Sequence, residues 1–353
     1  MKASVIIPTH NRRELLTRVL ETYQDQDCRS EDFELLVVDD GSTDDTAALF
    51  DDFTVEGVEG GGEIPKKYRE RILRLSGGSY TGFRQEASQD PARVQDLSGT
   101  RTDRNAELRY VRIAKSGRSV ARNIGITLSR NPLIIFADDD IFVEKAFVRK
   151  HIESHSSGDR SVVMGRVIHT AHLEDPFSAR WKPKDVNTAF LATGNASVMK
   201  IYLQDAGLFD EGYSVYGWED FDLGVHLSEM GIVSIRKNIY GYHYDPPSRS
   251  IRPKNVYEKE RERGIGAVYF FKNHPLPWVR RFTLINNRPL QFLVNVLGFR
   301  NWFLSREELF MCRGFFRLLI RYKGYFDGME EGRHTYGLEK PTQRLGGREN
   351  KEG

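Results

Sequence analysis

The side chains best suited to chemistry in this chain are carboxylates that directly follow apolar runs. Three aspartates at positions 138–140 follow the run 133–137, near the middle of the chain. Carboxylate oxygens are the ligands that Mg²⁺ and Mn²⁺ prefer, and either ion can bridge to a diphosphate. The triplet therefore predicts a metal and phosphate site. We favour this over a solvated turn because a buried strand precedes it.

A second pair of acids, Asp39 and Asp40, follows the apolar run 35–38. A carboxylate here can accept a hydrogen bond from a nucleobase N–H such as that of uracil, and a helix N-terminus close by suits a phosphate. The alternative is structural, with Ser42 capping the next helix and acids stabilising its first turn.

The segment Gly217-Trp218-Glu219-Asp220 opens a predicted helix at 219–230. The helix dipole keeps an acid of the first turn ionised, and an ionised carboxylate can remove a proton from an attacking hydroxyl. Trp218 offers an apolar surface on which a sugar ring could pack. We favour this function over the alternative, in which both acids only stabilise the start of the helix.

Imidazole and guanidinium groups add weaker indications. His243, within a run of tyrosines, is a candidate metal ligand, although a lone histidine among aromatic residues is more often a packing residue. Arg118 and Arg122 lie at the start of a predicted helix, where they could neutralise a phosphate or form a solvated basic face. His169 and His172 are spaced loosely for a metal pair, so we expect structural roles for them.

Strands and helices alternate along the first part of the chain, which predicts a parallel sheet. Asn11 and Glu14 have the spacing of a capping box before the first helix. The segment 57–105 is rich in Gly, Arg, Ser and Asp, and we expect it to be mostly disordered. The expected strands are 3–7, 33–38, 108–113, 133–137, 161–169 and 232–235, and the later expected helices are 116–129, 144–155, 219–230 and several after 253.

The composition suits a soluble protein. The 353 residues carry a net charge of +2, so bulk charge gives no reason to expect nucleic acid as a partner. Cys28 and Cys312 form no disulfide framework or metal motif, which fits a reducing compartment. No signal peptide and no apolar stretch of about 20 residues is visible, so we expect a cytoplasmic protein.

We expect a catalytic domain at 1–250, a helical extension at 251–338 and a flexible tail at 339–353.

The chain resembles the family 2 inverting glycosyltransferases, which have the GT-A (nucleotide-diphospho-sugar transferase) fold. The resemblance covers roughly residues 3–245 and implies an α/β fold with a mostly parallel central sheet flanked by helices. It depends on five motifs in order: Val5-Ile6-Ile7-Pro8-Thr9-His10-Asn11-Arg12, Val38-Asp39-Asp40-Gly41-Ser42-Thr43-Asp44, Ala121-Arg122-Asn123-Ile124-Gly125, Asp138-Asp139-Asp140 and Gly217-Trp218-Glu219-Asp220.

The resemblance also implies a nucleotide-sugar donor, usually a UDP-sugar, a Mn²⁺ or Mg²⁺ ion, and a glycan or glycolipid acceptor. Asp220 would be the catalytic base, and Glu219 would hold the acceptor. The residues implied for the donor are Pro8, Thr9, His10, Arg12, Asp40, Arg122, Asn123, Asp138 and Asp139. Those implied for the metal are Asp140, Asp138 and His243, with Asp139 as a rival of Asp140, and those implied for the sugar or acceptor are Gly194, Asn195 and Trp218.

The implied reaction is a single displacement. Asp220 deprotonates a hydroxyl that attacks the anomeric carbon from the face opposite the diphosphate, which inverts the configuration. A sugar-nucleotide pyrophosphorylase is the rival enzyme class, but the loop 8–12 lacks the glycine of its phosphate loop. A catalytically inactive sugar-binding or scaffold protein is the non-enzymatic rival.

Arg313, Arg317 and Arg321 recur every four residues beside apolar side chains in the predicted helix 305–322. Such a helix can lie on an anionic membrane surface. That would suit cell-envelope polysaccharide or glycolipid synthesis, with peripheral attachment at the inner face of the membrane. We favour the alternative, a helix packed on the catalytic domain or on a dimer partner.

Overall fold

A computed structural model describes residues 1–50, 106–155, 158–246, 253–285, 287–296 and 314–338. The segment 57–105 and the tail 339–353, for which we expected disorder, lie outside these residues. The chain divides into two compact units. We call residues 1–214 and 219–249 the sheet unit, and residues 215–218 and 250–353 the helical unit.

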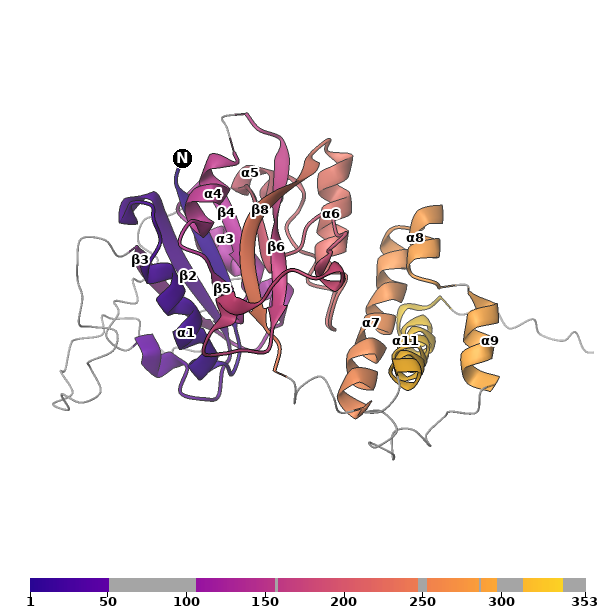
Figure 1. The fold of residues 1–353 in the computed structure, drawn as a ribbon. Coiled ribbons are helices and arrows are strands. Elements are labelled where there is room, and N and C mark those ends of the chain that lie inside the picture. The colour runs from indigo at the N-terminus through magenta and orange to yellow at the C-terminus, as the bar shows by residue number, and fades with distance from the viewer. Residues whose placement is uncertain (51–105, 156–157, 247–252, 286, 297–313, 339–353) are drawn as a thin grey trace, which may run out of the picture. The chain divides into compact units, whose positions relative to one another are not determined.

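The sheet unit contains one mixed sheet of eight strands in the order β3-β2-β1-β4-β7-β6-β8-β5 (Figure 1). Strands β1 to β4 pair in parallel and so do β6 and β8, whereas β7 is antiparallel to both neighbours and β5 to β8. Most pairings are therefore parallel, as expected. The strands are β1 (Ala3–Thr9), β2 (Phe33–Asp40), β3 (Glu107–Ile113), β4 (Leu133–Ala137), β5 (Ile141–Val143), β6 (Ser161–Thr170), β7 (Asn195–Met199) and β8 (Val233–Tyr244).

Helices cover both faces of this sheet (Figure 1). Alternate strand residues point to opposite faces, so Val5 and Ile7 join one core cluster and Ile6 another. The cluster of Val5 includes residues of α1 and α4, while the clusters on the other face include residues of α3, α5 and α6. The helices are α1 (Arg13–Gln24), α3 (Arg118–Leu128), α4 (Phe147–Glu153), α5 (Lys200–Asp205) and α6 (Glu219–Glu229).

Two predicted helix caps are wrong. Helix α1 has no side-chain cap, because Asn11 adopts a left-handed φ of 53° and its Oδ1 accepts hydrogen bonds from the N–H groups of Thr43 and Asp44. Ser42 caps no α-helix, since only the 3₁₀ turn Ala47–Phe50 follows it among the described residues, and its Oγ accepts from Asn11 N at 2.9 Å. These residues instead join the loops that follow β1 and β2.

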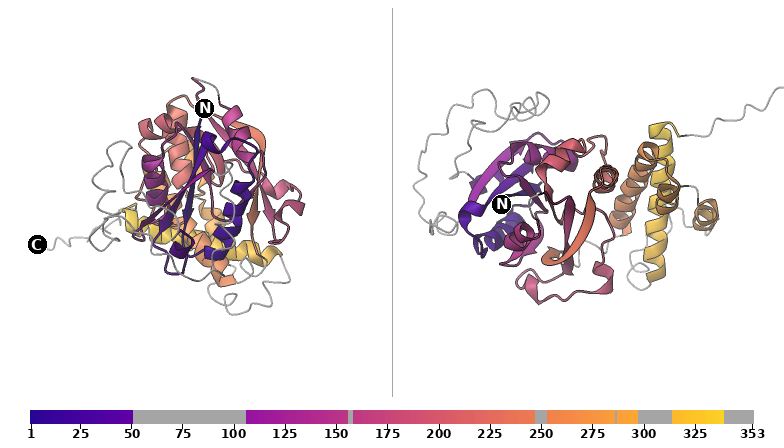
Figure 2. Two further views of the ribbon diagram at one scale, coloured as in Figure 1. Left: turned by 90° about the vertical axis from the view of Figure 1, so that its left-hand side faces the viewer. Right: turned by 90° about the horizontal axis from the view of Figure 1, so that it is seen from above.

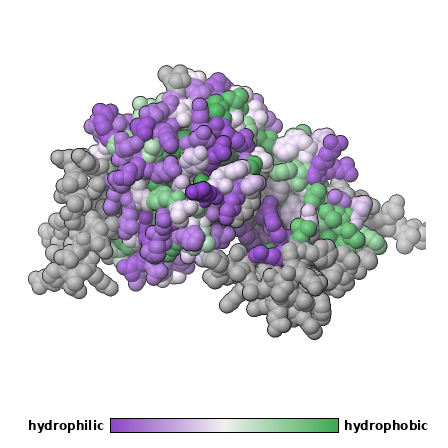
Figure 3. Space-filling view, viewed as in Figure 1, coloured by the Kyte–Doolittle hydropathy of each residue, from purple (hydrophilic) through white to green (hydrophobic). Residues whose placement is uncertain are grey.

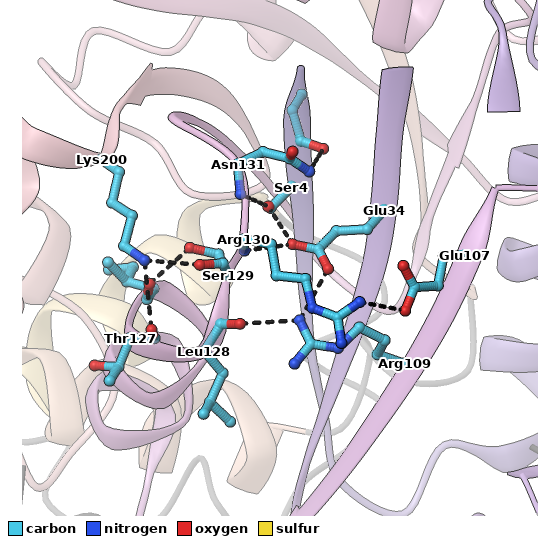
Figure 4. Close-up of polar contacts among 12 residues, drawn as sticks. Ser4, Glu34, Glu107, Arg109, Thr127, Leu128, Ser129, Arg130, Asn131 and Lys200 are labelled. Atoms are coloured by element: carbon cyan, nitrogen blue, oxygen red, sulfur yellow. Dashed lines mark hydrogen bonds and ion pairs between the residues drawn. The ribbon is translucent and has the colours of Figure 1, made fainter. Parts of the chain in front are cut away.

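A polar network fixes the opposite end of the same strands (Figure 4). Glu34, 3% exposed at the start of β2, accepts hydrogen bonds from Ser4 Oγ at 2.5 Å and from Arg109 Nη1 at 2.8 Å. Arg109 also donates to the carbonyl of Leu128, and Lys200 to that of Ser129. The side chains of Arg109 and Lys200 therefore donate hydrogen bonds to carbonyl groups at the C-terminus of α3 and hold this helix on the sheet.

The helical unit contains α7 (Pro253–Asn273), α8 (Pro277–Phe282), α9 (Arg288–Val296) and α11 (Gly314–Tyr336). Helices α7 and α11 lie side by side (Figure 2) and approach closely at glycines. A Cβ at Gly264 would overlap the carbonyl of Tyr325, and one at Gly328 that of Arg261. Part of the predicted helix 305–322 lies in α11, whereas Arg313 lies outside the described residues. None of the described helices is both long and apolar enough to cross a membrane.

Candidate active site

The carboxyl ends of β1, β2 and β4 bring polar side chains from distant segments together, as expected at this edge of an open α/β sheet. Thr9, the last residue of β1, donates a hydrogen bond from Oγ1 to Asp139 Oδ2 at 2.7 Å. Arg12 Nη1 lies 3.2 Å from Asp140 Oδ2. Pro8 lies in the same strand, and His10 directly follows it. Thr9 and Arg12, two of the predicted donor residues, thus contact the aspartate triplet.

Asp140 faces His243 across the antiparallel pair of β5 and β8. Asp140 Oδ1 is buried 3.4 Å from His243 Nε2, and no donor of the described residues completes a hydrogen bond to it. Burial opposes ionisation of both groups, but their mutual attraction outweighs it. The pKa of Asp140 is therefore lowered, and the positive charge of Arg12 contributes to this. The pKa of His243 is raised.

Arg122, on α3, joins the aspartate triplet to the start of α6. Its guanidinium lies 3.2 Å from Asp138 Oδ1 and 3.2 Å from Glu219 Oε1, and the residue is 4% exposed. Burial opposes its charge, yet these carboxylates outweigh the burial and raise the pKa of Arg122. The two groups of acids, far apart in the sequence, therefore belong to one site.

Asp220 lies beside Glu219 in the first turn of α6. Its Oδ1 accepts a hydrogen bond from Phe221 N at 2.9 Å. Burial, with the charge of Glu219 adding to it and that of Arg122 opposing it, raises the pKa of Asp220 to about 7. A carboxyl group with a pKa close to neutrality suits general base catalysis. Burial and the charge of Asp140 likewise raise the pKa of Asp139 to about 7.

Several predicted binding residues have their polar atoms engaged by the protein itself. Asp40 accepts hydrogen bonds from Lys115 Nζ and from the N–H groups of Ser116 and Gly117. Asn123 exchanges two hydrogen bonds with the backbone of Phe209. Their contacts with a nucleotide stay predictions.

Gly194 and Asn195, which we predicted to contact the sugar or acceptor, follow one another directly before and at the start of β7. The Asn195 side chain is 1% exposed and donates to the carbonyls of Arg166 and Ile239, so it joins β7 to β6 and β8. Gly194 adjoins the triplet, since a Cβ there would lie 3.3 Å from Asp138 Oδ2. A larger side chain at this position would crowd the Asp138 carboxylate.

Trp218 belongs to the helical unit, although it directly precedes the acids of α6. Its ring stacks on that of Phe270 with centroids 5.3 Å apart, and its Nε1 donates to the carbonyl of Arg263 at 2.7 Å. Trp218 is 5% exposed, so the surface that we predicted for a sugar ring is covered in this structure.

His169 lies beside a predicted metal ligand, which our sequence analysis did not anticipate. It pairs with His243 in the parallel register of β6 and β8, and the two Nδ1 atoms lie 3.2 Å apart. We expected β8 to end at residue 235, and so could not place His243 on the strand beside His169. The strand-forming residues Ile239, Tyr240, Tyr242 and Tyr244 could have indicated the longer strand.

The fold, with acids gathered at the carboxyl edge of a mixed sheet, defines a GT-A glycosyltransferase. The chain matches the model of Glycosyl transferase family 2 over residues 4–90 and 91–204. It therefore belongs to glycosyl transferase family 2, which sets aside the pyrophosphorylase alternative.

Individual relatives are distant. In an alignment of length 343, the chain is 24% identical to the glycosyltransferase YfnE of Bacillus subtilis. The alignment covers 78% of this chain and 75% of YfnE. It is 34% identical over 89 residues to the poly(ribitol-phosphate) beta-N-acetylglucosaminyltransferase TarS of Staphylococcus aureus, covering 24% of this chain and 16% of TarS. The mannosyltransferase PcManGT of Pyrobaculum calidifontis, solved with GDP-Man and Mn²⁺, aligns with a TM-score of 0.55 and 13% identity over 96% of this chain and 88% of its own.

Proposed function

We propose that this glycosyltransferase moves a sugar from a UDP-sugar to an acceptor hydroxyl, with inversion and with the help of a divalent metal ion. The observation that supports this most is Arg122, which lies 3.2 Å from both Asp138 and Glu219. A donor held at the triplet and a hydroxyl held at the start of α6 would therefore be neighbours.

The residues at the triplet suit a hard divalent cation. Asp140 offers a buried oxygen without a hydrogen bond from the described residues, and the imidazole of His243 lies 3.4 Å from it. Carboxylates with one imidazole are ligands that Mn²⁺ accepts well. Asp140, Asp138 and His243 would hold the ion, which when bound would neutralise charge on the departing diphosphate. The Mn²⁺ ion in the PcManGT structure supports a divalent metal ion as the cofactor.

Asp220 is the proposed general base. Its pKa of about 7 leaves it able to take a proton from a hydroxyl at neutral pH while still ionised in a large fraction of molecules. Glu219, held by Arg122, would position the same hydroxyl through its second oxygen, which is buried and accepts no hydrogen bond from the described residues. Removal of the proton as the oxygen attacks from the far side of the sugar would invert the anomeric carbon.

The acceptor that we propose is a cell-envelope polymer or glycolipid. Support comes from TarS, whose name gives a poly(ribitol-phosphate) acceptor.

We also propose peripheral membrane contact through the helical unit, where hydrophobic residues gather on the visible face (Figure 3). The exposed apolar side chains among its described residues include Trp278, Phe282, Phe292, Leu293 and Leu318. Flotation with anionic vesicles at low salt tests the contact, and protein that stays at the bottom of the gradient rules it out.

The donor experiment is a thermal-shift screen of UDP-, GDP- and dTDP-sugars with Mn²⁺, followed by measurement of nucleotide release. We expect a UDP-sugar to stabilise the protein only when Mn²⁺ is present, and to release UDP. Stabilisation by GDP-sugars alone would correct the donor. Absence of nucleotide release with every donor, with and without acceptors, would favour the inactive scaffold instead.

A further inference from the structure

A cavity of about 330 Å³ lies where β6 and β8 end in the sheet unit. Its walls include His169, His172, Arg180, Lys182 and Asp245. No predicted donor or metal residue is among them, and the function proposed above does not use the cavity. Its polar walls suit a polar ligand.

The charge of the walls favours an anion. Arg180 and Lys182 carry permanent positive charges, while Asp245 is the one carboxylate among the described lining residues. Neither Arg180 nor Lys182 forms an ion pair within the described part of the chain. Two cations that line one cavity and form no ion pair with a carboxylate suit the recognition of a phosphate or carboxylate, because charge-assisted hydrogen bonds are stronger than neutral ones.

The cavity begins one side chain away from the proposed metal ligands. His169, in its wall, has its Nδ1 3.2 Å from that of His243, whose Nε2 lies 3.4 Å from Asp140. Two backbone hydrogen bonds hold the end of β8 in place beside the cavity. Asp245 N donates to the carbonyl of Thr170, and Tyr244 N donates to the carbonyl of Asp140. An anion bound in the cavity would therefore lie close to the proposed metal ligands.

The loop that carries the two cations is held in place. Lys182 N donates to Asp185 Oδ2 at 2.8 Å, and Asp185 N donates back to the Lys182 carbonyl at 2.8 Å. The ring of Phe177 packs edge-on against Tyr242 with centroids 5.1 Å apart. Trp181, between the cations, is 42% exposed, and an exposed aromatic ring suits packing against a sugar or polyol.

The position of the cavity in the sheet indicates that it binds the acceptor and not the donor. Most of the predicted donor residues lie on or after β1, β2 and β4, whereas the cavity adjoins β6 and β8, on the far side of β7 in the sheet order. We propose that this cavity binds a phosphate or carboxylate group of the acceptor, which is therefore an acidic glycan or polyol phosphate. This inference rests on the proposed function, because it assigns the acceptor of the same site.

The test is calorimetric binding to the full-length chain with matched pairs of probes: ribitol 5-phosphate with ribitol, and glucose 6-phosphate or glucuronate with glucose. We expect at least one anionic probe to bind about 10-fold more tightly than its neutral partner, as for charge-assisted hydrogen bonds. The double variant Arg180→Ala/Lys182→Ala should lose this preference. The variant Lys2→Ala/Lys237→Ala, which removes the same charge at exposed positions outside the cavity, should keep it.

Equal binding of anionic and neutral probes by the wild-type protein, or a preference that survives Arg180→Ala/Lys182→Ala, overturns the inference. So does a loss in that variant of affinity for UDP-GlcNAc with Mn²⁺, because the cavity would then hold the donor. UDP release without acceptor separates the two proposals. Release of UDP without a preference for anionic probes leaves the proposed function standing and removes the acceptor site. A preference for anionic probes without release of UDP removes the proposed function and leaves only an anion site.

Discussion

At the scale of single residues, the charge balance around Asp220 decides how the site would work. Burial and Glu219 disfavour its ionised form, while the buried cation of Arg122 favours it, and the resulting pKa is about 7. A base with this pKa changes its protonation state within the neutral pH range, so its role has direct kinetic consequences.

The first of these is pH dependence. Asp220 must be ionised to accept a proton, so activity should be full above pH 7 and be lost as the pH falls through 7. We expect kcat/KM to drop about 10-fold for each pH unit below 7. Initial rates between pH 5 and pH 9, corrected for stability of the protein, check this. A profile that stays flat down to pH 5 would contradict the assignment.

Replacement of the base provides a second test. Asp220→Asn removes the proton acceptor and keeps the shape, so transfer should fall about 10²- to 10⁴-fold with little change in nucleotide affinity. Glu229→Gln, the same change at an exposed position of the same helix, is the control and should leave transfer within about twofold. Transfer close to normal in Asp220→Asn would show that another group is the base.

Arg122 should control the same pKa. Arg122→Gln removes the cation that favours ionised Asp220, so the acidic limb of kcat/KM should move to higher pH. Arg122→Lys keeps the charge and should move the limb less. The pH profiles of both variants measure this, and a limb that moves to lower pH in Arg122→Gln would refute the electrostatic explanation.

At the scale of elements, close packing of α7 on α11 depends on glycines. In α11 these are Gly324, Gly328 and Gly332, spaced four residues apart so that they lie on one face. Gly328→Val would push a side chain into the backbone of α7, and we expect it to cost about 3 kcal/mol or more. Glu330→Val places the same residue on the exposed side and should cost much less. Urea titrations followed by circular dichroism compare the two.

The network at the other end of the sheet should affect stability and leave chemistry alone. Glu34→Gln removes the charge that pairs with Arg109, and we expect a loss of about 2 kcal/mol in the free energy of unfolding. Glu107→Gln, in an exposed pair with Arg130, should cost about 0.5 kcal/mol or less. Both variants should keep the wild-type kcat, because Glu34 and Glu107 lie at the starts of β2 and β3 and the candidate site lies at the carboxyl ends of the strands. A reduced kcat in folded Glu34→Gln would contradict this separation.

At the scale of the whole molecule, the segment 215–218 belongs to the helical unit and is covalently followed by the proposed catalytic acids of α6. Trp218 packs on Phe270, and the next two residues are Glu219 and Asp220. Phe270→Leu removes the stacked ring, and displaced acids should lower kcat by about 10-fold with unchanged donor affinity. Phe292→Leu, at a residue 68% exposed, is the control. Equal kcat values in the two variants would show that the helical unit does not position the base.

Much of the fold followed from local patterns. The apolar runs at 3–7, 33–38 and 133–137 predicted strands β1, β2 and β4 because a strand buried on both faces must be apolar along its length. Strands β5 and β7 were missed. Both pair antiparallel with strands distant in the sequence. Strand β7 also contains Asn195 and Ser197, whose polar groups bond to neighbouring strands and to His151 and His155.

The sequence by itself determined the kind of chemistry available, because carboxylates after buried strands and at a helix start are local features whose residue types are fixed. Only the tertiary structure decided which of these groups face one another. Arg122 between Asp138 and Glu219, and His169 against His243, are contacts across elements. Such contacts depend on strand order and register, which are set by packing of the whole sheet and leave no mark in any one segment.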